Sequence, residues 1–153
     1  MTGLRKESIL IVDRRPEYID RMARALKPLG SRVIASRTWE DALLDFKQHN
    51  YRLVVTGVFM SGMGGIEGIR QVKRLDDRVQ VIAASEGWRD VSAEHALSAA
   101  MMVGADAVLP KPFDESDLTL LAEQCLEEAI QDFTPGLHGP ARIGSASGAF
   151  YAT

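Results

Sequence analysis

Short apolar runs alternate with segments of helical periodicity along most of the chain. Each run is unbroken rather than alternately apolar and polar, which indicates a strand that is covered on both faces of a sheet. We expect five strands, at residues 9–12, 33–35, 53–55, 79–84 and 107–109. Between and after them, apolar residues recur at steps of three and one, which predicts helices near residues 16–29, 38–49, 66–75, 90–103 and 114–133.

Particular residues mark where these helices begin. Pro16 occupies a first helical position, which suits its fixed φ angle. Thr38 and Asp41 have the spacing of a capping box, and Asp114 precedes the last and most regular apolar stripe. The sequence therefore predicts N-terminal caps at Thr38 and Asp114.

Five repeats of strand then helix predict an α/β fold. The expected architecture is a flavodoxin-like (βα)5 three-layer sandwich, whose parallel five-stranded sheet has the order 2-1-3-4-5. Ligands of such sheets bind in a crevice at the carboxyl ends of the strands. Five residues directly follow or end the predicted strands and form the candidate pocket: Asp13, Arg14, Gly57, Ser85 and Lys111.

Composition narrows the class of protein. With 153 residues, 46% of them apolar and 25% charged, the chain has the make-up of a globular domain. We expect one domain over residues 7–133 and a flexible tail over residues 134–153, where twelve of twenty residues are Gly, Pro, Ser or Ala. The single cysteine, Cys125, excludes an intrachain disulfide and favours a cytoplasmic location. The net charge of −3 and the short apolar runs give no reason to expect nucleic acid or a membrane as partner.

Five short motifs accompany the predicted strands in order. They are ILIVD at residues 9–13, LVVT at 53–56, MSGMGG at 60–65, GAD at 104–106 and KPF at 111–113. Together they resemble the receiver domain of response regulators in two-component signalling, and the resemblance covers residues 7–133. It implies a pocket in which an aspartate after the third strand accepts a phosphoryl group. It also implies Mg²⁺ held by acidic residues after the first strand, a hydroxyl after the fourth and a lysine after the fifth.

This chain keeps only part of that set. Asp13, Ser85 and Lys111 match the first acidic position, the hydroxyl and the lysine. Arg14 stands at the second acidic position, and Gly57 stands at the phosphoacceptor position. Because glycine has no side chain to carry a phosphoryl group, we expect a degenerate receiver, or pseudo-receiver, without a catalytic residue.

The charges of this pocket oppose a divalent cation. Asp13, Arg14 and Lys111 carry a formal charge of +1, and Asp13 is the only acidic ligand position retained. Two unit charges ~4 Å apart interact by about 4 kcal/mol at an effective dielectric constant of about 20. We therefore expect no cofactor, and Mg²⁺ binding that is weak or absent.

Each pocket residue also has a plain structural interpretation. Asp13 can cap the following helix or pair with Lys111, and Arg14 can point to solvent, as most surface arginines do. Gly57 can be a turn glycine or an introduced substitution, and Ser85 an ordinary loop hydroxyl. The sequence alone leaves these alternatives open.

Two residues indicate a partner face. The segment from Ser85 to Lys111 is longer than is usual in receiver domains, which predicts an enlarged loop or an extended start of the fourth helix around Trp88. Relatives bind partners or dimerise through the neighbouring face, where Val108 replaces a switching aromatic residue. An exposed Trp88 would anchor a partner, because tryptophan is enriched among interface hot spots. The alternative is a Trp88 side chain folded back onto the core.

The leading hypothesis is a stand-alone receiver that acts by phosphorylation-independent protein–protein interaction and not as an enzyme. Its partner would be a histidine kinase or another signalling protein, and a homodimer stays open. One alternative is a sensor that binds a small anion through Arg14 and Lys111. Another is a conventional phosphorelay receiver in which Gly57 is an introduced substitution of the phosphoacceptor aspartate.

Overall fold

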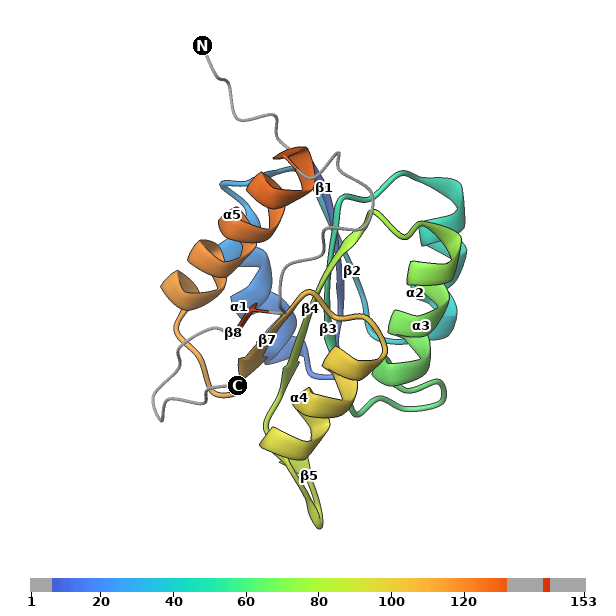
Figure 1. Cartoon of the computed structure of the whole chain (residues 1–153), viewed down its shortest axis with the longest axis vertical. Helices are drawn as coiled ribbons and strands as arrows, with labels where there is room; N and C mark the ends of the chain where they lie inside the picture. Colours follow the sequence, from blue (N-terminus) through green and yellow to red (C-terminus); the bar gives the residue numbers. More distant parts are fainter. Residues whose placement is uncertain (1–6, 132–141, 144–153) are drawn as a thin grey trace.

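A parallel sheet with helices on both faces organises the chain. The computed structural model describes residues 7–131 and 142–143. In spatial order, the strands of the sheet are β2 (Gly30–Ser36), β1 (Glu7–Val12), β3 (Leu53–Gly57), β4 (Gln80–Ser85), β7 (Ala107–Pro110) and β8 (Arg142–Ile143) (Figure 1). The helices are α1 (Pro16–Leu26), α2 (Trp39–Gln48), α3 (Gly65–Leu75), α4 (Ala93–Met102) and α5 (Glu115–Gln131). In the described ranges, none of these helices is long and apolar enough to cross a bilayer.

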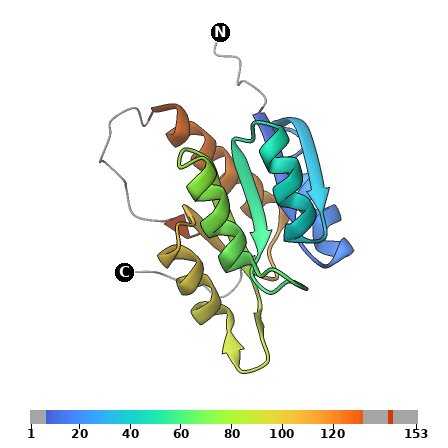
Figure 2. The ribbon, with the colours of Figure 1, turned by 90° about the vertical axis from the view of Figure 1, so that its right-hand side faces the viewer.

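The strand order confirms the predicted topology. The order β2-β1-β3-β4-β7 is the expected 2-1-3-4-5, because β7 is the fifth strand of this sheet along the chain. Helices α1 and α5 cover one face of the sheet, and α2, α3 and α4 cover the other (Figure 2). The flavodoxin-like three-layer architecture is therefore confirmed.

Burial on both faces explains the unbroken apolar runs. Every residue of β3 is buried, and so are residues 9–12 of β1. In β1, Leu10 and Val12 pack into the layer of α2, α3 and α4, whereas Ile9 and Ile11 pack into the layer of α1 and α5. A strand between two apolar layers has room for a polar side chain only where that side chain finds a hydrogen-bond partner.

Thr56 is such a residue, and Trp39 is its partner. The indole N–H of Trp39 donates a hydrogen bond to Thr56 Oγ1 at 2.9 Å, and that hydroxyl donates to the carbonyl oxygen of Gly57 at 2.7 Å. Trp39 is fully buried. Gly68 of α3 makes space for the indole, because a Cβ at this position would overlap the ring. A buried aromatic thereby fixes the backbone at the carboxyl end of β3.

Helix starts largely follow the predicted caps. Pro16 opens α1, and the hydroxyl of Thr38 accepts a hydrogen bond from the Asp41 N–H at 3.2 Å at the start of α2. The start of α5 takes a different form, since the Asp117 carboxylate accepts a hydrogen bond from the Asp114 N–H at 3.2 Å. Both arrangements satisfy backbone groups near a helix terminus.

The segment before α4 is an enlarged loop, one of the two predicted alternatives, and only the predicted start of the helix is wrong. The helix expected from residue 90 begins at Ala93, because β5 (Gly87–Trp88) and β6 (Val91–Ser92) form an antiparallel hairpin. Arg89 in its turn has a φ of 53°, a left-handed conformation that ends any helical continuation. Ser92 then caps α4, because its hydroxyl accepts a hydrogen bond from the His95 N–H at 3.1 Å.

The C-terminal segment also differs in one place. Arg142 and Ile143 pair in parallel with Ala107 and Val108 at the edge of the sheet. Two residues of the predicted tail therefore have strand structure. An edge strand presents unpaired backbone groups that an extended segment can join without any sequence periodicity. The rest of residues 134–153 lies outside the described residues.

Replacement of each tryptophan by phenylalanine tests the packing around Thr56. Trp39→Phe is expected to lower the free energy of unfolding by about 1–3 kcal/mol, because it removes a buried hydrogen bond and leaves part of the space under Gly68 unfilled. Urea unfolding followed by circular dichroism measures the change. Trp88→Phe is the matched control at an exposed position and is expected to stay within about 0.5 kcal/mol of the parent. Equal losses in both variants would contradict this account of the core.

Candidate functional site

The carboxyl ends of the strands bring the predicted pocket residues to one edge of the sheet. Asp13 follows β1, Gly57 ends β3, Ser85 ends β4 and Lys111 follows β7. Lys111 Nζ lies 2.7 Å from Asp13 Oδ2, and the two side chains are only 7% and 1% exposed. This buried ion pair is one of the alternatives that the sequence left open for Asp13.

Neighbouring groups make further polar contacts with Asp13 and Lys111. The backbone N–H of Arg15 donates a hydrogen bond to Asp13 Oδ1 at 2.9 Å. Lys111 Nζ lies 4.0 Å from the centroid of the Tyr18 ring, which is a cation–π distance. Burial raises the pKa of the Tyr18 phenol, so this ring stays neutral beside the ion pair. Sequence reasoning missed Tyr18, because a tyrosine on the buried side of a helix carries no signal of such a contact.

Gly57 leaves the middle of this edge without a side chain. A Cβ at this position would lie 2.9 Å from Asp13 Oδ2 and 3.5 Å from the sulfur of Met60. The Asp13 carboxylate therefore rests against the Gly57 backbone. Any larger residue at position 57 requires Asp13 to move.

Arg14 lies against the hairpin that precedes α4. Its guanidinium carbon is 4.7 Å from the centroid of the Trp88 ring, and its carbonyl oxygen accepts a hydrogen bond from Arg37 at 3.2 Å. The sequence left Arg14 between the pocket and solvent. The structure instead places its charge over an aromatic ring, a favourable position for a guanidinium.

Ser85 and Arg15 tie the hairpin to the strand ends. The buried hydroxyl of Ser85 accepts a hydrogen bond from the Gly87 N–H at 3.0 Å. Arg15 bridges two carboxylates, at 2.6 Å to Glu86 and 2.7 Å to Glu17. The hydrogen bond to Glu17 raises the pKa of Arg15, and a backbone hydrogen bond together with Arg15 lowers the pKa of Glu17. These contacts hold the base of the hairpin at the carboxyl edge of the sheet.

A family model places this arrangement among known proteins. The model of the response regulator receiver domain matches residues 9–123, which run from β1 into α5 and include every pocket residue described above. This chain belongs to the response regulator receiver family. The match therefore establishes the receiver fold and places the chain in two-component signalling.

Two curated relatives agree with the family. The receiver is 29% identical over 123 residues to a two-component response regulator of Arabidopsis thaliana, and the match covers 79% of this chain and 19% of that protein. It is 31% identical over 103 residues to a response regulator receiver protein of Anaeromyxobacter sp. (strain Fw109-5), covering 67% of this chain and 42% of that protein. The chain therefore spans less than half the length of each relative.

Solved structures of receiver domains superpose closely. The BeF3-activated receiver domain of DrrB gives a TM-score of 0.71 at 26% identity, over 80% of this chain and 98% of that one. A CheY-like receiver domain protein from Methanospirillum hungatei gives a TM-score of 0.73 at 23% identity, over 83% of this chain and 98% of that one. The second likeness concerns the fold alone.

The receiver family implies a magnesium ion, and the residues at this edge do not fit one. Mg²⁺ is held through oxygen ligands, usually including one or two carboxylates. Asp13 already contacts Lys111 Nζ and the Arg15 N–H, while Gly57 and Arg14 supply no side-chain oxygen. Within residues 7–131 and 142–143, no group of three or more His, Cys, Asp or Glu side chains is placed to hold a metal ion.

The two residues predicted for a partner face have different environments. Trp88 is 43% exposed on the hairpin, as a partner anchor requires. Val108 is completely buried in the layer beside α4, so its assignment to a partner face is wrong. The position lies in a central part of β7 where both faces of the sheet are covered, and a small aliphatic side chain packs there without reaching the surface.

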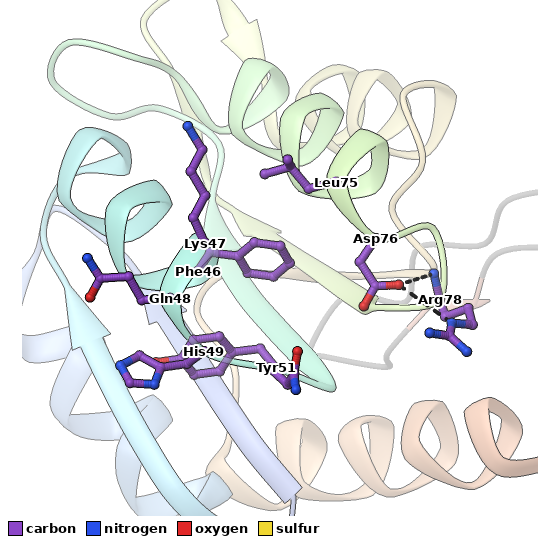
Figure 3. Close-up of a pocket in the computed structure, with 9 residues that line it drawn as sticks. Phe46, Lys47, Gln48, His49, Tyr51, Leu75, Asp76 and Arg78 are labelled. Carbon is purple, nitrogen blue, oxygen red and sulfur yellow. Dashed lines mark hydrogen bonds and ion pairs between the residues drawn. The ribbon is translucent and has the colours of Figure 1, made fainter.

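A second hollow lies at the opposite edge of the sheet, where α2 and α3 end (Figure 3). Its volume is about 420 Å³, and none of the predicted pocket residues lines it. Tyr51 in its wall donates a hydrogen bond to the Asp45 carboxylate, and burial raises the pKa of this phenol. Asp76 and Arg78 on its rim already contact each other, at 3.7 Å. The hollow therefore offers no converging set of unpaired charges.

Removal of the lysine tests how strongly the fold depends on the buried ion pair. Lys111→Met is expected to lower the free energy of unfolding by about 3–5 kcal/mol, because it leaves the Asp13 carboxylate buried without its counter-charge. Asp13→Asn combined with Lys111→Met is expected to recover part of that loss, since neither charge then remains. Urea unfolding at neutral pH measures both.

The control for this experiment is a second lysine–aspartate pair. Lys73 and Asp106 are also 2.7 Å apart, but their side chains are 18% and 31% exposed. Lys73→Met is expected to cost only about 1 kcal/mol, because water screens the remaining carboxylate. A Lys111→Met variant no less stable than Lys73→Met would contradict a dependence on burial.

Proposed function

We propose that this receiver acts in two-component signalling as a protein-binding module whose state does not depend on phosphorylation of an aspartate. On this proposal it is a degenerate receiver and not an enzyme. One observation carries the proposal: the phosphoacceptor position is Gly57, and the neighbouring Asp13 carboxylate is already held by Lys111.

The charges around Gly57 support this proposal. In a phosphorylatable pocket, carboxylates hold a divalent cation that offsets the charge of the transferring phosphoryl group. Here Asp13, Arg14 and Lys111 have a formal charge of +1, and the one carboxylate contacts an ammonium group instead of a metal. Lys111 thereby offsets the charge of the one carboxylate that this pocket retains.

The same ion pair argues against the small-anion alternative. An anion in this crevice would need the Lys111 ammonium as a ligand, but that group is 2.7 Å from Asp13 and almost completely buried. Binding would require the pair to break and Asp13 to remain buried without a counter-charge, which is costly. We therefore retain the protein-binding function alone.

We further propose a cytoplasmic location and a signalling protein, such as a histidine kinase, as partner. Receiver domains interact with signalling proteins such as kinases, and the family match brings this chain into that class. The lone cysteine is buried and fits a reducing compartment. Sedimentation analysis of the purified chain tests whether a homodimer also forms.

Magnesium titration tests the metal part of the proposal. Because Arg14 lies over Trp88, binding of Mg²⁺ beside Asp13 would change the fluorescence of this exposed tryptophan. We expect no saturable change up to millimolar Mg²⁺, since one carboxylate that is already paired is a poor site for a divalent cation. Arg14→Asp combined with Gly57→Asp restores the acidic ligands and is expected to bind. Saturable sub-millimolar binding to the unmodified chain would contradict the proposal.

Incubation with acetyl phosphate and Mg²⁺ tests the absence of aspartyl phosphorylation. Intact-mass measurement is expected to detect no phosphoryl adduct on the unmodified chain. Gly57→Asp alone is also expected to remain unlabelled, because Arg14 still repels the metal and the new side chain crowds Asp13. Arg14→Asp with Gly57→Asp is expected to be labelled. Labelling of the unmodified chain, or equal labelling of the single and double variants, would contradict the proposal.

A further inference from the structure

The basic side chains of the carboxyl edge that face solvent gather around one aromatic ring. The Trp88 centroid lies 4.7 Å from the Arg14 guanidinium carbon and 5.7 Å from that of Arg89, and Phe59 approaches to 6.4 Å between ring centroids. Arg37 joins this group by donating a hydrogen bond to the Arg14 carbonyl oxygen. We call Trp88 and these three arginines the Trp88 patch.

The arginines of the Trp88 patch retain unused hydrogen-bond donors. Across the part of the chain that the structure describes, neither Arg14, Arg37 nor Arg89 forms an ion pair with a carboxylate. By contrast, Arg15 beside them is bound by Glu17 and Glu86. A guanidinium that lies over an aromatic ring keeps its planar fork of N–H groups available for bidentate binding of a carboxylate.

The hairpin presents this patch in a fixed position. β5 and β6 pair with each other, Ser85 holds the Gly87 N–H, and Arg15 holds Glu86. The hairpin projects beyond the end of the sheet beside α4 (Figure 1). Trp88 and its cross-strand partner Val91 are 43% and 41% exposed. A preordered aromatic and aliphatic pair loses little side-chain entropy when a partner covers it.

We propose that the Trp88 patch binds an acidic segment of a protein partner, in which carboxylates adjoin an aliphatic or aromatic side chain. Carboxylates would occupy the forks of Arg14 and Arg89, and the apolar side chain would cover Trp88 and Val91. This inference rests on the proposed function, since it names the chemistry of the partner that such a module recognises.

The composition of the surrounding surface favours a protein segment over nucleic acid. Nucleic-acid binding needs an extended basic path along the phosphate backbone. The Trp88 patch is small, Asp90 lies in its hairpin turn, and α4, which follows the hairpin directly, carries Glu94 and no lysine or arginine. A short acidic segment with an apolar anchor matches both the charge and the exposed Trp88–Val91 pair.

Selection from a random peptide library tests the proposal, with the whole chain as bait. Selected peptides are expected to be enriched in Asp and Glu next to aliphatic or aromatic residues. In fluorescence anisotropy, Trp88→Ala is expected to raise the Kd of such a peptide roughly tenfold or more, and Arg14→Gln or Arg89→Gln several-fold. Affinity is expected to fall as salt is raised.

Arg74→Gln is the matched control, because Arg74 is an exposed arginine at the end of α3. It is expected to leave the Kd unchanged, and circular dichroism checks that all variants are folded. Enrichment of peptides without acidic residues, failure to enrich any peptide, or equal binding by Trp88→Ala and the parent would overturn the proposal.

Two further measurements identify a different occupant. Gel-shift binding of a double-stranded oligonucleotide that Trp88→Ala abolishes would assign the patch to nucleic acid, and self-association that Trp88→Ala abolishes would assign it to a second copy. Either result overturns the peptide proposal. None of these results depends on phosphorylation, whereas acetyl phosphate labelling would refute the proposed function without changing peptide binding, so the two failures are distinguishable.

Discussion

The buried ion pair between Asp13 and Lys111 is the constraint on which the rest of the carboxyl edge depends. It joins the ends of β1 and β7, which are not neighbours in the sheet, across the position of Gly57. Desolvated charges are costly unless each has its counter-charge and hydrogen bonds, and here the Arg15 N–H and the Tyr18 ring supply further contacts. Both charges of the pair are therefore compensated by groups within the chain.

The basic side chains at the carboxyl edge of the sheet fall into two groups. Lys111 and Arg15 are neutralised within the fold, by Asp13 and by Glu17 with Glu86. Arg14 lies outside this network and over Trp88, on a hairpin that interrupts the chain between β4 and α4. The arginine at position 14 thus has two physical effects, because it brings no carboxylate to the pocket and adds a cation beside the exposed Trp88.

The structure contains the helices and strands predicted from periodicity, because each depends on the local sequence pattern and on burial. The apolar runs at residues 9–12 and 53–55 are buried on both faces, and the Thr38 cap depends only on residues within one turn. The start of α4 was predicted too early, because the two strands of the preceding hairpin have only two residues each and show no periodicity. The burial of Val108 likewise followed from strand neighbours that the sequence does not name.

By itself the sequence determined the order of strands and helices, the sheet topology and the residues that reach its carboxyl edge. It determined them because periodicity, caps and right-handed crossovers leave few arrangements. Tertiary structure alone decided that Asp13 contacts Lys111 as well as the Arg15 N–H, where the Arg14 charge rests and that Arg142 and Ile143 join the sheet. Such contacts depend on side chains and backbone edges that lie far apart in the chain, so no local pattern records them.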